Sequence, residues 1–236
     1  MNIIFLTLSR FSDIEERGIY TDLMRKFRNE GHSVYVVSSC ERRLGLGTSI
    51  IENNSVHMLN VKTLNIQKTN LIEKGIGTLL LERRYRCAIR KYFKGVTFDL
   101  ILYSTPPITF TNVVKYLKKR NPEAVSYLLL KDIFPQNAVD MRMFSKRSAF
   151  YHFFREKEKA LYKVSDFIGC MSHANVEYLR LHNSYYQKWR VEVAPNSIEL
   201  REECCEPFEG RDSVREEYGL PANIPIFIYG GNLGKP

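Results

Sequence analysis

The stretch that decides the fold is Tyr127–Asp140, with the sequence YLLLKDIFPQNAVD. It begins inside an apolar run, Val125–Leu130, that one serine interrupts, and such a run is typical of a strand buried on both faces of a parallel sheet. Lys131 and Asp132 follow at once, and Pro135 is expected to stop regular structure because it lacks a backbone N–H. The stretch therefore predicts an α/β fold with a charged loop at the carboxyl end of a central strand.

The position of Asp132 allows two interpretations. In open α/β sheets, ligands bind outside the carboxyl ends of the strands, so an acid at this place would face a crevice. A carboxylate can also cap a turn there without touching any ligand. Position alone leaves both interpretations open.

Composition limits the classes of protein to consider. The chain has 236 residues, 44% of them hydrophobic, which is enough for one large domain or for one domain and the beginning of another. Its five cysteines are odd in number and contain no Cys-x-x-Cys pair, which fits neither a disulfide framework nor a zinc site. We therefore expect a reducing, cytoplasmic location.

Hydropathy and charge bear on possible partners. No apolar run approaches the length of a membrane span, and Asn2–Leu8 is too short for a signal peptide and lacks its basic flank, so any membrane contact is expected to be peripheral. The formal net charge of +9 indicates an anionic partner. Nucleic acid, lipid head groups and nucleotide-linked substrates are all compatible with that charge.

Apolar runs and helical periodicity alternate along the chain. Strands are expected over Asn2–Leu8, Val34–Ser38, Val56–Val61, Phe98–Tyr103, Val125–Leu130, Asp166–Met171 and Arg190–Ala194. Helices are expected at about Ile19–Asn29, Asn70–Lys94, Ile108–Arg120, Phe150–Val164 and Ala174–Leu181, and Cys40–Ser55 is expected to be a polar loop. This alternation predicts a doubly wound, Rossmann-like parallel sheet.

The predicted helix Asn70–Lys94 is basic and amphipathic. Arg83, Arg84 and Arg90 are among the basic residues that fill much of its polar side. An ordinary helix packed on the sheet, with a solvated charged face, would show this pattern. So would a helix that docks on an anionic membrane surface, where each Lys or Arg contributes about 1 kcal/mol.

Small hydroxyl residues follow the predicted strand Phe98–Tyr103. Ser104 and Thr105 precede two prolines that would open the next helix, so backbone N–H groups near them would point into the same crevice as Asp132. The same residues would also serve as plain helix caps.

The character of the sequence changes after Ser197. A polar, acidic segment that extends to Arg211 is typical of a linker between domains. A short helix, Asp212–Tyr218, then leads to an expected buried strand, Ile224–Tyr229, and to the loop GGNLGKP at 230–236. Glycines let a backbone approach a diphosphate and a lysine neutralises it, although this loop is neither a Walker A sequence nor G-x-G-x-x-G.

Four phrases in this order resemble the family 4 glycosyltransferases of the GT-B type. They are DIFPQNAVD at 132–140, YKVSDFIGCMS-AN at 162–175, VEVAPNSIE at 191–199 and YGGNLGK at 229–235. More narrowly, the chain resembles the bacterial branch that builds capsular and O-antigen polysaccharides, including fucosaminyl transferases. The resemblance runs from RGIYTDLMRKF at 17–27 to the final lysine.

The resemblance implies a retaining enzyme with two facing Rossmann-like domains. Such an enzyme moves a sugar from a nucleotide sugar to a growing, lipid-linked polysaccharide acceptor, and it requires no metal or other cofactor. Residues 1–200 would be the acceptor-side domain, 201–222 the linker, and 223–236 the start of the nucleotide-sugar domain. We expect the protein in the cytoplasm, peripheral to the inner face of the cell membrane, with no nucleic-acid partner.

The matching phrases also give roles to individual residues. Asp132 would orient or deprotonate the acceptor hydroxyl, a task that needs contact within about 3 Å. The phrases also place Gln136, Ser172 and Asn175 in the acceptor-side crevice and Gly230, Gly231, Asn232, Gly234 and Lys235 at the donor diphosphate. The patterns described above add Ser104 and Thr105 to the crevice and Arg83, Arg84 and Arg90 to a membrane face. Asn196 falls in the hinge phrase PNS.

Three departures from the family pattern put activity in doubt. Arg142 stands where a small residue is usual, His173 stands where proline is usual, and the rest of the nucleotide-sugar domain is absent from the sequence. We therefore expect no catalysis from this chain alone. The chain would then be a piece of a longer enzyme, a non-catalytic remnant, or an acceptor- and membrane-binding half of a polysaccharide assembly system.

Two other classes find less support in the sequence. A nicotinamide-dependent enzyme would need the dinucleotide fingerprint, but the loop SRFSDIEERG at 9–18 has a single glycine. A nucleic-acid-binding module would explain the net charge, but the basic residues are spread over several helices and match no known reader motif.

Overall fold

The computed structural model describes residues 1–53, 55–66, 69, 71–185, 190–200, 211–221 and 224–228. The chain divides into two compact units, Met1–Glu199 and Leu200–Pro236. The candidate site and almost all of the regular structure belong to the first unit.

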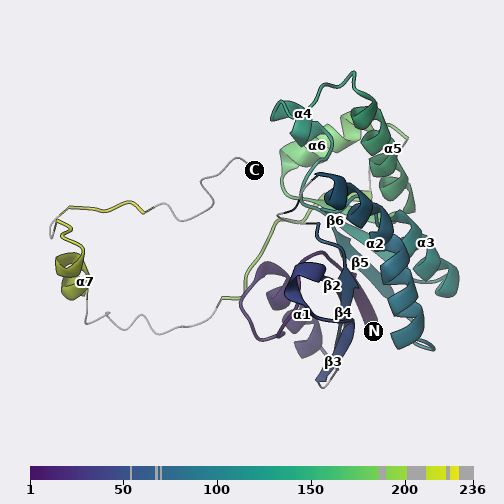
Figure 1. Ribbon diagram of the computed structural model, residues 1–236, viewed down its shortest axis with the longest axis horizontal. Helices are drawn as coiled ribbons and strands as arrows, with labels where there is room; N and C mark the ends of the chain where they lie inside the picture. The colour runs from purple at the N-terminus through teal and green to yellow at the C-terminus, as the bar shows by residue number, and fades with distance from the viewer. Residues whose placement is uncertain are drawn as a thin grey trace. The chain divides into compact units, whose positions relative to one another are not determined.

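The first unit is built on an eight-stranded sheet with the order β3-β4-β2-β1-β5-β6-β7-β8 (Figure 1). The strands are β1 Asn2–Leu6, β2 Ser33–Glu41, β3 Ser49–Asn53, β4 Val56–Thr63, β5 Leu100–Ser104, β6 Val125–Leu130, β7 Phe167–Cys170 and β8 Val191–Val193. Neighbouring strands run parallel except for β3 and β4, which are antiparallel. The predicted doubly wound, Rossmann-like sheet is confirmed.

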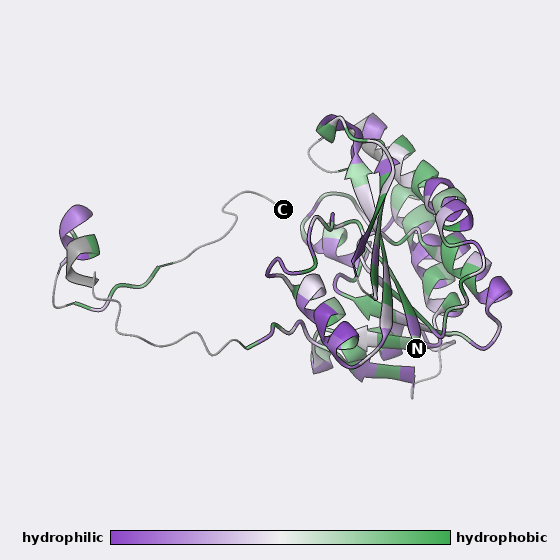
Figure 2. Ribbon diagram, turned by 90° about the horizontal axis from the view of Figure 1, so that it is seen from below, coloured by the Kyte–Doolittle hydropathy of each residue, from purple (hydrophilic) through white to green (hydrophobic). Residues whose placement is uncertain are grey.

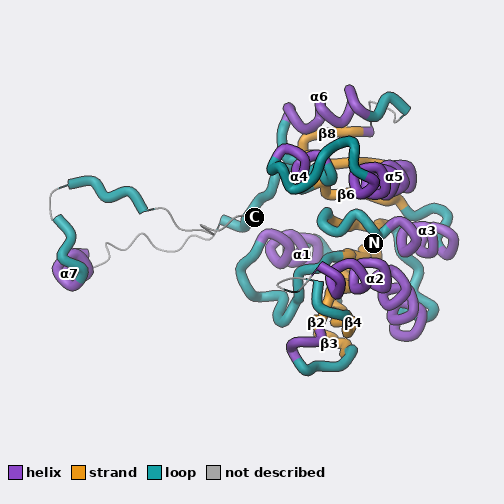
Figure 3. The backbone as a smooth tube through the Cα atoms, turned by 45° about the horizontal axis from the view of Figure 1, so that its top comes forward, coloured by secondary structure: helices purple, strands orange, loops and turns teal. Residues whose placement is uncertain are grey.

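Helices cover both faces of this sheet. They are α1 Ile19–Asn29, α2 Leu71–Tyr92, α3 Thr111–Arg120, α4 Gln136–Asp140, α5 Ala149–Val164 and α6 His173–His182, with a short 3₁₀ turn at Arg42–Leu44. Figure 3 shows α1 on one side of the sheet and α2, α3 and α5 on the other. The hydrophobic strands lie between these helices (Figure 2), and buried side chains of α2, α3 and α5 join those of the strands in one core cluster.

The direction in which the sheet grows reverses at β1. The chain first adds β2, β4 and β3 on one side of β1, and then returns to add β5, β6, β7 and β8 on the other side. In sheets of this kind the ligand crevice opens outside the carboxyl ends of the strands, at the reversal. The loops 7–18, 105–110 and 131–135 therefore border the expected crevice.

Two elements differ from the prediction. The expected loop Cys40–Ser55 contains the edge strand β3, whose residues are mostly exposed and therefore lack the apolar pattern of a buried strand. No regular structure runs through Pro135, as expected, but the short helix α4 begins directly after it, which was not predicted. A proline is tolerated there because the first N–H groups of a helix have no partner within the helix.

The second unit contains α7, Arg211–Glu217, close to its expected position. The expected buried strand at Ile224–Tyr229 is not seen, because residues 224–228 have no strand structure and the Phe227 side chain is 96% exposed. A strand forms only when a neighbouring strand takes up its backbone hydrogen bonds, and no described residue pairs with this segment. Tyr229 and the glycine-rich loop 230–236 lie outside the described residues.

Candidate functional site

Thr105 fixes the loop that carries Asp132. The Thr105 Oγ1 accepts hydrogen bonds from the backbone N of Lys131 at 3.0 Å and of Asp132 at 3.4 Å. Its own backbone N donates to the Leu129 carbonyl at 3.1 Å. Because Thr105 is buried at the end of β5, it holds this loop from inside the protein, while the Asp132 side chain is exposed.

Tyr20, the second residue of α1, lies beside the same loop. Its ring packs on Phe5 with a centroid distance of 5.0 Å, and its hydroxyl forms a hydrogen bond with Ser104. Burial raises the pKa of Tyr20, the hydrogen bond with Ser104 lowers it, and the charge of Asp132 raises it further. Residues from β1, β5 and the loop after β6 are therefore brought together by one phenol.

Lys131 places a half-buried cation next to these groups. Its Nζ lies 5.8 Å from the centroid of the Tyr20 ring and donates a hydrogen bond to Asn196 Oδ1. Burial lowers the pKa of Lys131. We call Tyr20, Thr105, Lys131 and Asp132 the strand-exit cluster.

The strand-exit cluster combines an exposed carboxylate, a phenol and an ammonium group at the reversal of the sheet. A carboxylate in hydrogen-bond reach of a hydroxyl can take its proton, and an ammonium group can neutralise a phosphate. Among the described residues, no three His, Cys, Asp or Glu side chains come together in a way that could hold a metal ion.

Gln136 lies at the start of α4, a few residues beyond Asp132. Its Nε2 donates to Asp140 Oδ1 at 2.7 Å, whereas its buried Oε1 has no hydrogen-bond partner within the part of the chain that is described. Buried acceptors are normally satisfied. Gln136 therefore offers an unused acceptor near the expected crevice.

Ser172 and Asn175 follow β7, the strand next to β6. Ser172 is the N-cap of α6, and its Oγ accepts from the backbone N of Asn175 at 3.3 Å. This is ordinary helix capping. No described contact joins this pair to the strand-exit cluster.

The helix that follows the two prolines has a carboxylate at its N-terminus. Helix α3 begins only at Thr111, and the backbone N of Asn112 donates to Glu82 Oε1 at 2.6 Å. The Asn112 side chain donates to the other oxygen of Glu82 at 2.8 Å. A carboxylate of α2 therefore already occupies the N-terminus of α3.

The structure shows the surroundings of the two single-residue departures from the family pattern, Arg142 and His173. Arg142 has a φ of 58°, the left-handed conformation that small residues, glycine above all, adopt at least cost. His173 is the first residue of α6, directly after its N-cap, where proline is favoured because its φ is already helical. His173 is exposed, so the change from proline places no side chain in the core.

The three arginines assigned to a membrane face do not share one environment. Arg83 and Arg90 are exposed on α2, whereas the half-buried Arg84 donates from Nη1 to the Lys62 carbonyl at 2.9 Å. The residues assigned to the donor diphosphate, Gly230, Gly231, Asn232, Gly234 and Lys235, lie outside the described residues.

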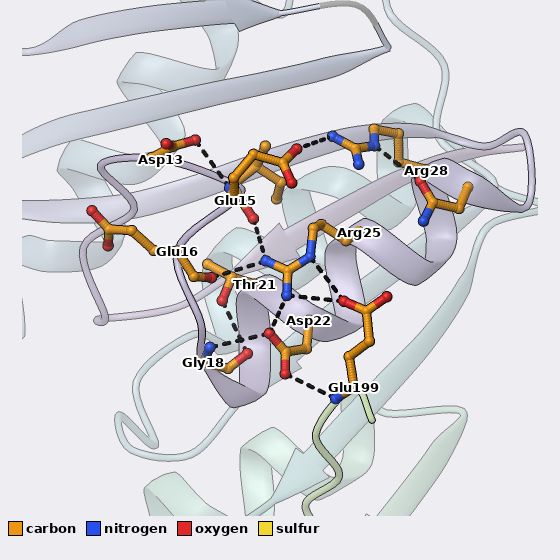
Figure 4. A network of polar contacts seen from close by, with 11 residues as sticks. Asp13, Glu15, Glu16, Gly18, Thr21, Asp22, Arg25, Arg28 and Glu199 are labelled. Atoms are coloured by element: carbon orange, nitrogen blue, oxygen red, sulfur yellow. Dashed lines mark hydrogen bonds and ion pairs between the residues drawn. The ribbon is translucent and has the colours of Figure 1, made fainter. Parts of the chain in front are cut away.

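A buried ion network holds the other border of the crevice (Figure 4). Arg25 donates to the carbonyls of Ile14 at 2.6 Å and Glu16 at 2.9 Å, which lie in the loop after β1. It also pairs with Asp22 and, at 3.1 Å, with Glu199. The network therefore joins the crevice loop, α1 and the last residue of the first unit.

The sequence pattern points to Asp132 but assigns no site role to Tyr20 or Lys131. Lys131 could have been included because it leaves the same strand as Asp132. Tyr20 has a weaker signal, since it opens the helix that follows the first strand and thus belongs near the carboxyl end of β1.

Comparison with known proteins supports the fold. No family model matches the chain, and no curated protein sequence matches it. A sucrose-phosphate synthase from Thermosynechococcus elongatus is similar in structure, with a TM-score of 0.61 and 16% identity over 95% of this chain and 54% of that one. An E. coli structure described as trehalose-6-phosphate bound with UDP-2-fluoro glucose gives a TM-score of 0.57 and 10% identity, over 84% of this chain and 49% of that one.

A trehalose-6-phosphate synthase structure gives a similar result, with a TM-score of 0.58 and 10% identity over 84% of this chain and 50% of that one. These neighbours are GT-B glycosyltransferases, so the first unit has the Rossmann-like fold found in that class. The chain spans about half the length of these neighbours.

Proposed function

We propose that this chain is the acceptor-side half of a retaining glycosyltransferase. The enzyme would move a sugar from a nucleotide sugar to a lipid-linked polysaccharide acceptor, at the inner, cytoplasmic face of the cell membrane and without a metal. The observation that carries the proposal is the exposed carboxylate of Asp132 at the carboxyl end of β6, one strand from the reversal between β1 and β5 of a GT-B-like sheet. The sequence resemblance to the capsule and O-antigen branch supports the choice of acceptor.

In this proposal the strand-exit cluster handles the acceptor. Asp132 orients or deprotonates the attacking hydroxyl, and Gln136 belongs to the same acceptor-side crevice. Lys131 neutralises a phosphate of the lipid carrier. The loop 230–235 contacts the donor diphosphate.

The experiment that tests the proposal replaces Asp132 by Asn at the chromosomal gene and measures incorporation of labelled sugar into lipid-linked and surface polysaccharide. Removal of a general base commonly costs about 10²- to 10⁴-fold, so incorporation should fall to background at normal protein level. Glu123→Gln, at an exposed carboxylate next to the amino end of β6, is the matched control and should leave incorporation unchanged.

Wild-type incorporation by the Asp132→Asn strain would contradict the role of Asp132. If the purified chain binds a lipid-linked saccharide but no nucleotide sugar yields labelled product in a membrane extract, a non-catalytic acceptor-binding half is the better description.

We also include peripheral membrane association in the proposal. No helix within the described residues is long and apolar enough to cross a membrane. The basic face of α2 supports contact with an anionic surface.

A further inference from the structure

One stripe of side chains runs along the solvent face of α2. It consists of Ile76, Leu79, Arg83, Arg86 and Arg90, which are separated by alternate steps of three and four residues and therefore lie on one side of the helix. Ile76 is 48% exposed and Leu79 is 60% exposed, and the three arginines are exposed as well. The stripe is thus apolar in its first half and cationic in its second half.

The cationic half of the stripe borders a hollow. Arg83, Arg86, Cys87 and Arg90 of α2 line it together with Tyr116 of α3, and its volume is about 400 Å³. Arg120 donates from Nη1 to the Tyr116 hydroxyl at 3.1 Å, which adds a further cation beside the wall that Tyr116 forms.

The arginines of the hollow are available to a ligand. Among the described residues, no carboxylate forms an ion pair with Arg83, Arg86 or Arg90. Glu82, the acid nearest to them in sequence, is held by Asn112 through two hydrogen bonds. Guanidinium groups bind phosphate through two parallel hydrogen bonds, so three of them around a hollow favour a phosphate group.

We propose that this hollow binds the phosphate group of an anionic membrane lipid. The apolar half of the stripe favours a lipid over a soluble phosphate, because Ile76 and Leu79 lie on the same side of the helix and can enter the acyl boundary next to the head group. The inference rests on the proposed association of the chain with a membrane. It assigns Arg86, and not Arg84, to the membrane-facing arginines together with Arg83 and Arg90.

Flotation of the full chain with vesicles tests the proposal. Vesicles of phosphatidylcholine with phosphatidylglycerol should bind the chain, and vesicles of phosphatidylcholine alone should not. The double variant Arg86→Gln, Arg90→Gln should weaken the partition coefficient by about 25-fold, that is, about fivefold for each cation. The matched control Lys146→Gln, Arg147→Gln removes the same charge from the exposed loop before α5 and should have little effect.

The exposed Cys87 supplies a second readout inside the hollow. Anionic vesicles should slow the alkylation of Cys87, which peptide mass spectrometry measures. The variant Leu79→Ser should weaken this protection. Inorganic phosphate is the soluble probe. Protection by inorganic phosphate without vesicle binding would assign the hollow to a soluble phosphate and overturn the lipid proposal.

Equal loss of vesicle binding in the double variant and in its control would show attraction by net charge alone, and it would overturn the hollow as a site. Neither readout involves sugar transfer. A negative result here therefore removes the membrane association from the proposed function but leaves the proposed sugar transfer untouched, and failure of the transfer assay leaves this test intact.

Discussion

At the scale of single residues, the buried hydroxyl of Thr105 positions the loop that carries the exposed carboxylate of Asp132. Its Oγ1 accepts from two successive backbone N–H groups, those of Lys131 and Asp132. Two loops of the crevice, after β5 and after β6, are joined through this one oxygen. Thr105 is therefore a positioning residue for Asp132 and needs no contact with a substrate.

Thr105→Val should lower the free energy of unfolding by about 1–3 kcal/mol, because the variant leaves two N–H groups without their acceptor at almost unchanged side-chain volume. Urea unfolding at neutral pH measures this change. Thr105→Ser keeps the oxygen and serves as the control, with a smaller loss. An equal effect of both variants would show that the methyl group, and not the hydrogen bonds, accounts for the stability.

Residues could be predicted from the sequence where a single strand determines their place. The position of Asp132 after a buried strand is predictable, because it directly follows a long apolar run. Tyr20 was not found, because its contact with Ser104 depends on how α1 crosses the loop after β1. The unused oxygen of Gln136 was also beyond prediction, since it depends on the short helix α4 that follows Pro135.

At the scale of elements, the network of Asp22, Arg25 and Glu199 holds α1 to the crevice loop. The hydrogen bond from the backbone N–H of Glu199 is the largest cause of the lowered pKa of Asp22; burial opposes it, and bonds from Gly18 and Arg25 add to it. The charged form of Asp22 is thus favoured in the folded protein.

This lowered pKa predicts a pH dependence of stability. An acid with a lower pKa in the folded state stabilises the fold above its unfolded pKa, about 3.9 for Asp, and loses that contribution as the pH falls through the folded pKa. Wild type should therefore lose stability more steeply than Asp22→Asn below about pH 4. Urea unfolding at a series of pH values measures both slopes, with Glu123→Gln as a control that should follow wild type. Parallel curves for wild type and Asp22→Asn would contradict the prediction.

Elements were predictable where burial makes the pattern regular. The strands from β5 to β7 are apolar runs and the long helices show apolar periodicity, and their expected bounds differ from the observed ones by at most three residues. The strand β3 was missed because an exposed edge strand needs few apolar residues, and only its pairing with β4 defines it.

At the scale of the whole molecule, the second unit exposes large apolar side chains. Tyr218 is 69% exposed, Phe227 is 96% exposed and Ile228 is 85% exposed. Contiguous exposed apolar surface promotes association between molecules. The sequence predicts a buried strand here, whereas residues 224–228 have no strand structure.

We expect the chain to associate reversibly with rising concentration, which sedimentation velocity would detect. The variant Phe227→Asp, Ile228→Asp should shift the equilibrium toward the monomer, because two charges oppose apolar contact. Leu181→Asp changes an exposed leucine of the first unit and should leave the equilibrium unchanged. A chain that stays monomeric throughout, or equal shifts in both variants, would contradict this expectation.

The contact between Arg25 and Glu199 also has a mechanical consequence. Tension applied at Leu200 reaches Asp22 and Arg25 of α1 first, through the backbone and side chain of Glu199. The three-residue edge strand β8 is thereby shielded from being peeled off the sheet. The same load passes from Arg25 to the carbonyls of Ile14 and Glu16. Force applied at the end of the first unit therefore reaches the crevice loop before it reaches the sheet.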